Sequence, residues 1–356
     1  MKKWFYIAIL AVAAILTGCT KVEVVNTDSK VVSFTVGSYA PQTKANVSLL
    51  GDTESFSSRA FLHAEGDDRV QEFFGTAGET ITWQSGTKEW TPSHDYYWPK
   101  SAGSYINFVS WYGGSPSVTE TTFTWNNTVL TTGTENLMWA DKAWRYNDNA
   151  KVYPNLDDET VVNEGVPTLF HHALARVRFT AKQTKDVEGS VSWAVTVNSL
   201  SLSGVKNKGT LSLTNEVDPN ETMTVAWSPA TPAWTFADGT ANYIKATAAK
   251  DLTTTVQEVI PYKSVFPQAV TDVKVNISYT VVTTYDLGSN NTKVVSEDVT
   301  KNDISLSAFT PTITAWAMNS QITYNININP DTQVITIIPV EANWAGDNDE
   351  YPINIE

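Results

Sequence analysis

Cysteine is almost missing from this chain of 356 residues, since Cys19 is the only one. No internal disulfide can form, so the fold must be held by core burial and strand pairing. Basic residues are also scarce: 24 Lys and Arg face 38 Asp and Glu, and the net charge is −14. Such a chain repels phosphate backbones, which excludes nucleic acid as a natural partner. The four histidines leave few of the usual catalytic groups.

Long apolar runs are lacking too. The stretch Trp4–Leu16 falls short of the roughly 20 apolar residues that a transmembrane helix needs, and no later segment reaches that length. It follows Lys2 and Lys3 and ends in Leu16-Thr17-Gly18-Cys19. A basic start, a short apolar core, small residues and then Cys are typical of a bacterial lipoprotein signal. We expect residues 1–18 to be removed, Cys19 to carry lipid as the new N-terminus, and residues 19–30 to form a tether. The alternative is a signal peptide with an unmodified cysteine.

After the tether, apolar side chains alternate with polar ones, the period of a half-buried strand. The alternation is clear in Val31–Tyr39, Tyr105–Trp111, Ala175–Phe179, Val273–Val281 and Ile322–Ile328. Turn residues separate these segments, and no segment after the signal has helical periodicity. The sequence therefore predicts an all-β protein of the sandwich type.

Two local signals refine this prediction. The alternation from Val191 changes phase before Leu200, which predicts a β-bulge near Asn198. Asn329-Pro330-Asp331 separates two apolar segments and predicts a hairpin turn.

The chain is long enough for two sandwich domains. The polar stretch Lys182–Gly189 separates two strong strand signals, so we expect an N-terminal domain at residues 31–185 and a C-terminal domain at 186–356.

Enzymatic and metal chemistry have little support. The chain has no G-x-S-x-G run and no Ser or Thr with a His base at motif spacing, so a hydrolase is the weakest interpretation. His171-His172 could suggest a metal site, but adjacent strand residues point to opposite faces and no third ligand follows at a useful spacing. The sequence supports no cofactor.

Tryptophan offers a second functional interpretation. A row of Trp residues could stack on sugars at a surface, although aromatic residues in strands are more often core. This is the glycan-binding alternative, a surface lipoprotein that stays monomeric. The row consists of Trp83, Trp90, Trp98, Trp111 and Trp125.

Two basic residues follow the first strand, Lys44 in Thr43-Lys44-Ala45 and Arg59 in Ser58-Arg59-Ala60. Basic residues in exposed polar linkers are ready sites for proteases. Both are candidate cleavage residues, and ordinary surface residues are the alternative.

Several segments together resemble the fimbrillins, the subunits of lipoprotein-derived type V pili. The likeness spans nearly the whole chain, and its order and spacing carry more weight than any one motif. It lies in the signal through Cys19, Tyr97-Trp98-Pro99 with Tyr105–Tyr112, Asn136–Ala140, Phe170–Val177, and Trp316–Asn319 followed by Tyr324, Val340 and Trp344.

This resemblance implies two tandem transthyretin-like β-sandwich domains and a lipid-anchored precursor at the cell outer membrane. It implies that a trypsin-like protease removes the anchor and the first strand, Val31–Tyr39, at Lys44 or Arg59. A strand from a neighbouring subunit, here roughly Val334–Glu356, would fill the groove and build a fimbrium for adhesion and biofilm formation. Val334–Val340 is apolar on both faces, as a strand buried on both sides would be. Whether the chain is a shaft, tip or anchor subunit stays open.

Overall fold

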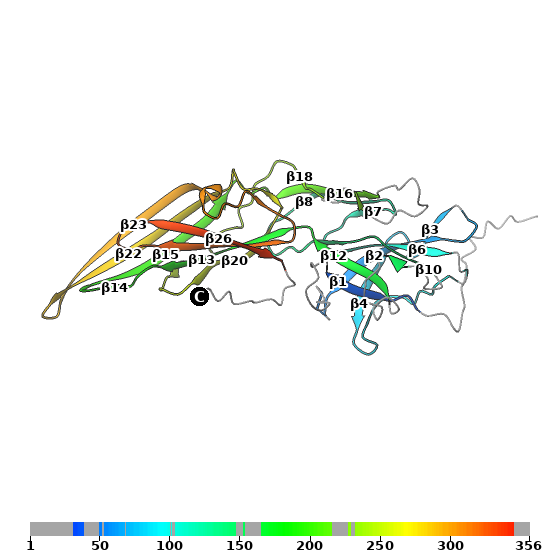
Figure 1. The fold of residues 1–356 in the computed structure, drawn as a ribbon, viewed down its shortest axis with the longest axis horizontal. Helices are drawn as coiled ribbons and strands as arrows, with labels where there is room; N and C mark the ends of the chain where they lie inside the picture. The colour runs from blue at the N-terminus through cyan, green and yellow to red at the C-terminus, as the bar shows by residue number, and fades with distance from the viewer. Residues whose placement is uncertain are drawn as a thin grey trace, which may run out of the picture.

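The computed structural model describes residues 31–38, 50–51, 53–67, 69–99, 101, 104–146, 152–153, 165–215, 227–228 and 232–344, and the structural statements below refer to these. Strands dominate, and the single helix among these residues is the short 3-10 turn η1 (Leu306–Ala308). The all-β prediction is confirmed. Figure 1 shows an elongated molecule, with an N-terminal lobe on the right and a C-terminal lobe on the left. No helix in this part of the chain is both long and apolar enough to span a bilayer.

The N-terminal lobe is built on a closed ring of hydrogen-bonded strands. Around the ring the order is β2, β6, β9, β12, β1, β5 and β4, and β4 pairs with β2 again. β10 and β11 extend from β6, and β3 borders β2. The strands are β1 (Phe34–Ser38), β2 (Ser55–His63), β3 (Val70–Glu72), β4 (Glu79–Gln84), β5 (Glu89–Pro92), β6 (Tyr105–Tyr112), β9 (Met138–Ala140), β10 (Ala143–Tyr146), β11 (Val152–Tyr153) and β12 (Val166–His172).

The C-terminal lobe is a β-sandwich with one apolar core between its sheets. One sheet has the order β20-β13-β25-β26, and the other has the order β14-β15-β22-β23 with β19 beside β15. A short pair, β21 with β24, adds to the lobe. The strands are β13 (Ala175–Gln183), β14 (Val187–Glu188), β15 (Val191–Ser203), β19 (Lys250–Asp251), β20 (Gln257–Val265), β21 (Gln268–Ala269), β22 (Lys274–Gly288), β23 (Asn291–Ser305), β24 (Ala315–Trp316), β25 (Ser320–Ile328) and β26 (Ile335–Asn343).

Both local predictions for this lobe are confirmed. The pairing of β15 with β22 shifts register between Val197 and Ser199, so the bulge falls at Asn198. The turn after Ile328 joins β25 to β26 as an antiparallel hairpin. The Asn329 side chain accepts hydrogen bonds from the backbone N–H groups of Asp331 and Thr332, which closes the turn.

A third sheet connects the lobes. β8 comes from the N-terminal half and pairs with β16 from the C-terminal half, so strands from both halves share this sheet (Figure 1). Beneath it lies an aromatic cluster that includes Trp125 and Trp234, whose rings stack 6.2 Å apart. The strands are β7 (Ser117–Val118), β8 (Thr122–Val129), β16 (Lys208–Asn215), β17 (Trp227–Ser228) and β18 (Thr235–Phe236).

The change from one lobe to the other lies earlier than the expected boundary after residue 185. β13 begins at Ala175 and is an inner strand of the C-terminal sandwich. The polar stretch Lys182–Gly189 is the end of β13 and its turn into β14, not a linker between domains. Its charges lie at the surface, where Lys185 pairs with Glu188 and Asp331.

Candidate functional site

The candidate site is the place in the ring that the first strand, β1, occupies. β1 runs parallel to β12, from Phe34 opposite Val166 to Ser38 opposite Phe170. On its other edge Phe34 pairs with Trp90 of β5. Just before the strand, Val32 donates its backbone N–H to the carbonyl oxygen of Tyr96 at 2.8 Å. β1 therefore has neighbours on both sides, and without it the ring would be open between β12 and β5.

Alternate side chains from Val32, just before β1, to Val36 within it belong to the apolar core of the ring. Val32, Phe34 and Val36 are 0, 3 and 9% exposed, whereas Thr35 between them is half-buried. The Phe34 ring meets Phe56 and Phe108 edge to face, at centroid distances of 5.6 and 5.5 Å. Aromatic pairs of this kind add to the free energy gained from burial alone. A chain without β1 would expose an apolar groove lined by these rings and two unpaired strand edges.

The two predicted cleavage residues differ in placement. Lys44, like Cys19, lies outside the described residues. Arg59 does not lie in a linker as expected: it is in the middle of β2, opposite Val109 of β6. Its side chain is 14% exposed and forms an ion pair with Glu72. The expectation failed because Ser58 and Ala60 are small residues that look like a linker in sequence, yet both are fully buried.

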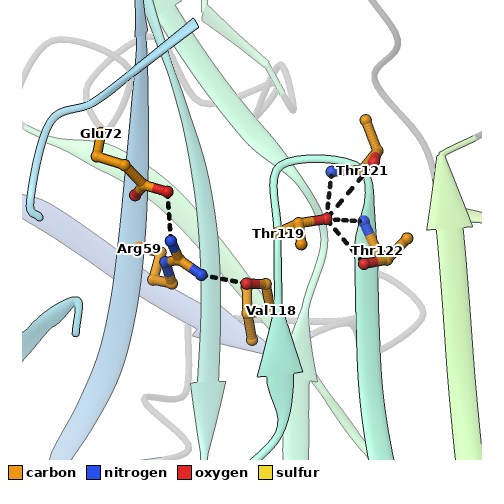
Figure 2. A network of polar contacts seen from close by, with 6 residues as sticks. All are labelled: Arg59, Glu72, Val118, Thr119, Thr121 and Thr122. Atoms are coloured by element: carbon orange, nitrogen blue, oxygen red, sulfur yellow. Dashed lines mark hydrogen bonds and ion pairs between the residues drawn. The ribbon is translucent and has the colours of Figure 1, made fainter. Parts of the chain in front are cut away.

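Figure 2 shows what Arg59 does in the folded chain. Its guanidinium donates to Glu72 of β3 and to the carbonyl oxygen of Val118 at the end of β7. Beyond Val118, the Thr119 hydroxyl oxygen accepts from the backbone N–H groups of Thr121 and Thr122 and closes the β7–β8 turn. Arg59 thus holds the connecting sheet against the ring.

We expect Arg59→Gln to lower the free energy of unfolding by about 1–3 kcal/mol, because the Val118 carbonyl oxygen loses its guanidinium donor and the exposed Glu72 carboxylate loses its ion pair. Urea unfolding monitored by circular dichroism measures this. The matched control is Arg69→Gln, since Arg69 is 84% exposed and forms an ion pair with Asp67 in a surface turn; its loss should cost less than about 1 kcal/mol. Equal changes in the two variants would contradict the role given to Arg59.

The His171-His172 pair ends β12, and its side chains face opposite ways as expected. His171 bonds to an Asp141 carboxylate oxygen at 2.8 Å and stacks on Trp139. His172 bonds to the Asn136 side-chain oxygen at 3.1 Å, and burial lowers its pKa to about 3. Within the described ranges, no three His, Cys, Asp or Glu side chains gather as metal ligands would.

The tryptophans belong to the core rather than to a sugar-binding surface. Trp90, Trp98, Trp111 and Trp125 are all under 10% exposed. Trp83 is half-buried and packs on Trp90 at 5.7 Å. Where the structure describes burial, no Trp side chain is exposed, so the glycan-binding alternative lacks the exposed tryptophans it needs there.

The C-terminal strand β26 lies at the edge of its sheet, paired along its whole length with β25. The expectation of burial on both faces fails here, since Ile337 is 3% exposed but Ile338 is 44% exposed. In a sandwich of two sheets, one face of each strand packs on the core and the other faces solvent, so burial of both faces would need a third layer. The strand is followed by Trp344, whose ring stacks on His172 at 4.0 Å.

Trp344 fixes the end of β26 at the junction of the lobes. The Arg176 guanidinium lies 4.8 Å from the centre of the Trp344 ring. The Trp344 backbone N–H donates to the Asn319 carbonyl oxygen at 2.7 Å. The sequence pointed to Trp344 but not to its partners His172 and Arg176, because these lie on strands far from it in the chain. The same holds for the Phe56 and Phe108 walls around β1.

Three solved structures are similar to this chain over most of its length. A candidate cell adhesion protein from Bacteroides uniformis shares 14% identity at a TM-score of 0.43, covering 88% of this chain and 98% of that one. A fimbrial protein from Bacteroides vulgatus shares 14% identity at 0.44, covering 88% and 99%. A candidate cell adhesion protein from Parabacteroides distasonis shares 8% at 0.42, covering 88% and 98%.

A search of curated proteins found no match. The model of the fimbrillin-like family, in contrast, matches residues 56–344, which is most of the chain and reaches from β2 of the N-terminal lobe to the end of the C-terminal lobe. The chain belongs to the fimbrillin-like family.

Proposed function

We propose that this chain is a pilus subunit that loses its first strand to a protease and polymerises by accepting a strand from a neighbouring subunit. Family membership supports a pilus role at the cell surface. Strand exchange is supported by the position of β1, the first described strand of the chain. β1 closes the ring by pairing with β12 on one edge and with β5 on the other. A strand from another subunit could restore the ladder, and its alternate side chains would fill the places of Val32, Phe34 and Val36.

Cleavage falls after Lys44 in this proposal. That cut removes Cys19 and all of β1, and it leaves Ala45 as the new N-terminus. A cut after Arg59 would split β2, which pairs with both β4 and β6 and is an integral part of the ring. Proteases bind their substrates as exposed extended segments, which a strand paired on both edges cannot supply.

The donated strand comes from the residues after Trp344. β26 is paired over its full length, and both Ile337 and Trp344 are buried, so withdrawing it would break the C-terminal lobe. Residues 345–356 span roughly 40 Å when fully extended. Pro352 lacks a backbone N–H and so must face a position that needs no donor. Donation to the next subunit is head to tail and does not close, which builds a filament.

The proposal includes the precursor and its place. Cys19 carries lipid that holds the precursor at the outer membrane, and a trypsin-like protease releases it into the fimbrium, which supports adhesion and biofilm formation. Two or more acyl chains anchor a protein durably, whereas one chain binds only marginally. The chain acts as a structural subunit and not as an enzyme. In a tip or anchor subunit, β1 would be retained.

The test uses purified residues 20–356 and a protease that cuts after Lys and Arg, followed by negative-stain microscopy and size-exclusion chromatography. We expect cleavage after Lys44 and growth of filaments. Lys44→Gln should stay uncut at this position and monomeric. The matched control is Lys88→Gln, in the exposed β4–β5 turn, which should polymerise like the parent. A parent chain that is cut after Lys44 yet never assembles would contradict strand exchange.

A further inference from the structure

A buried polar cluster lies on the outer side of the ring, where β6 passes the break between β9 and β10. Lys142 sits in that break and is 1% exposed, which is rare for a lysine. Asn107 of β6 is 5% exposed. Glu120, in the β7–β8 turn, completes the cluster, and the proposed strand exchange uses none of these residues.

The strand register places Lys142 and Asn107 on one face. β10 pairs with β6 so that Ala143 lies opposite Phe108 and Trp144 lies opposite Asn107. Lys142, two residues before Trp144, therefore shares the face of Asn107 in a diagonal position. Diagonal neighbours in an antiparallel pair are about 7–8 Å apart, which a lysine side chain spans.

Glu120 bonds to both residues. The Lys142 Nζ donates to the Glu120 carbonyl oxygen at 2.9 Å. The Asn107 Nδ2 donates to the Glu120 Oε1, which also bonds to His63 Nε2. His63 is fixed in turn by stacking on Tyr105 at 4.4 Å. The Asn107 amide is therefore held through its nitrogen, and its buried Oδ1 has no hydrogen-bond partner.

The electrostatics suit a nucleophilic amine. Burial lowers the pKa of Lys142 to about 8, although the Glu120 charge opposes this. Burial alone would raise the pKa of Glu120, but hydrogen bonds from His63 and Asn107 outweigh it and hold the pKa below its ordinary value. A carboxylate beside a buried ammonium can take its proton, which leaves a free amine next to an amide.

We propose that Lys142 and Asn107 form an intramolecular amide bond, with Glu120 as the catalytic proton carrier. The Lys142 Nζ attacks the Asn107 side-chain carbonyl carbon, so an Nζ–Cγ bond forms and the Cγ–Nδ2 bond breaks. Of the two protons that Nζ gives up, Glu120 passes one to the departing Nδ2, and the other leaves with it as ammonium. No oxidant, metal or cofactor is needed.

The bond would join β6 to the β9–β10 segment in the lobe that contains β1. A cross-link closes a loop in the unfolded chain and so favours the folded state. It would keep this part of the ring together while β1 is absent and before a neighbour fills the groove. The competing interpretation is a cluster held by hydrogen bonds and charge alone, with Lys142 only supporting the β7–β8 turn.

Trypsin digestion of the full chain recovered from cells, followed by mass spectrometry, decides between the two. Between Lys100 and Lys142 the sequence has no Lys or Arg, and Arg145 follows. A lysine in an amide bond is not cut, so we expect a peptide of residues 101–145, lighter by one ammonia than its sequence mass. A peptide of residues 101–142 would overturn the proposal, even if ammonia were lost, because that loss would mark a succinimide at an asparagine.

Two variants separate chemistry from folding. Glu120→Gln keeps the shape of the side chain but cannot carry the proton, and should yield the 101–142 peptide at full mass. The matched control is Glu135→Gln, whose carboxylate accepts hydrogen bonds within its own loop, from Thr131 and Thr132; it should retain the cross-linked peptide. Cross-linking that persists in Glu120→Gln would overturn the role of Glu120.

Discussion

Replacing Phe34 with alanine should lower the free energy of unfolding of the unprocessed chain by about 3–5 kcal/mol, the usual cost of truncating a buried phenylalanine. Phe34 is 3% exposed, and inside the closed ring of strands it packs edge to face on the aromatic rings of Phe56 and Phe108. Those rings come from different strands, so the hole cannot easily be filled. Guanidinium unfolding of residues 20–356 measures the change.

The matched control is Thr35→Ala, the next residue on the same strand. Thr35 is half-buried and points away from the ring interior, so its loss should cost less than about 1 kcal/mol. In assembled filaments the substitution of Phe34 should have no effect, because β1 is gone. Filaments of the Phe34→Ala variant that were less stable than those of the parent would show that β1 remains in place.

Replacing Trp344 with alanine should cost a similar amount, about 3–5 kcal/mol. Its ring is 4% exposed and lies between His172 and the Arg176 guanidinium at the lobe junction. The loss removes ring stacking and a cation–π contact together. Thermal unfolding should show a transition at a lower temperature than in the parent. The substitution should weaken the junction between the lobes rather than the core of either lobe.

The control for Trp344 is Val334→Ala in the turn before β26. Val334 is 53% exposed, so its truncation should change stability by less than about 0.5 kcal/mol. If Trp344→Ala were equally mild, β26 could leave its sheet easily, and the donated strand would have to include β26 itself.

The strands themselves could be predicted well from the sequence. Period-two alternation located β1, β6, β22 and β25, and a change of phase located the bulge at Asn198. These features depend on residues close together in the chain, where the pattern of burial is direct. The hairpin turn at Asn329 belongs to the same class.

The arrangement of the strands could not be predicted in the same way. The parallel pairing of β1 with β12 joins residues over a hundred positions apart, and no local pattern specifies it. Arg59 was misplaced because buried small residues on either side look like a linker. The Lys142 cluster likewise has no motif, since only the folded strands bring Asn107 and Glu120 together.

The most direct test of the account is the N-terminal residue of this chain in fibres purified from cell surfaces, read by terminal sequencing and intact mass. Strand exchange with cleavage after Lys44 predicts Ala45. An acylated Cys19 in the fibres would mean that β1 is retained and that this chain is not a strand-accepting shaft subunit. A start at Ala60 would mean that half of β2 is lost. The ring would then be broken at β2 as well, which would contradict the proposal that the donated strand binds in the place of β1.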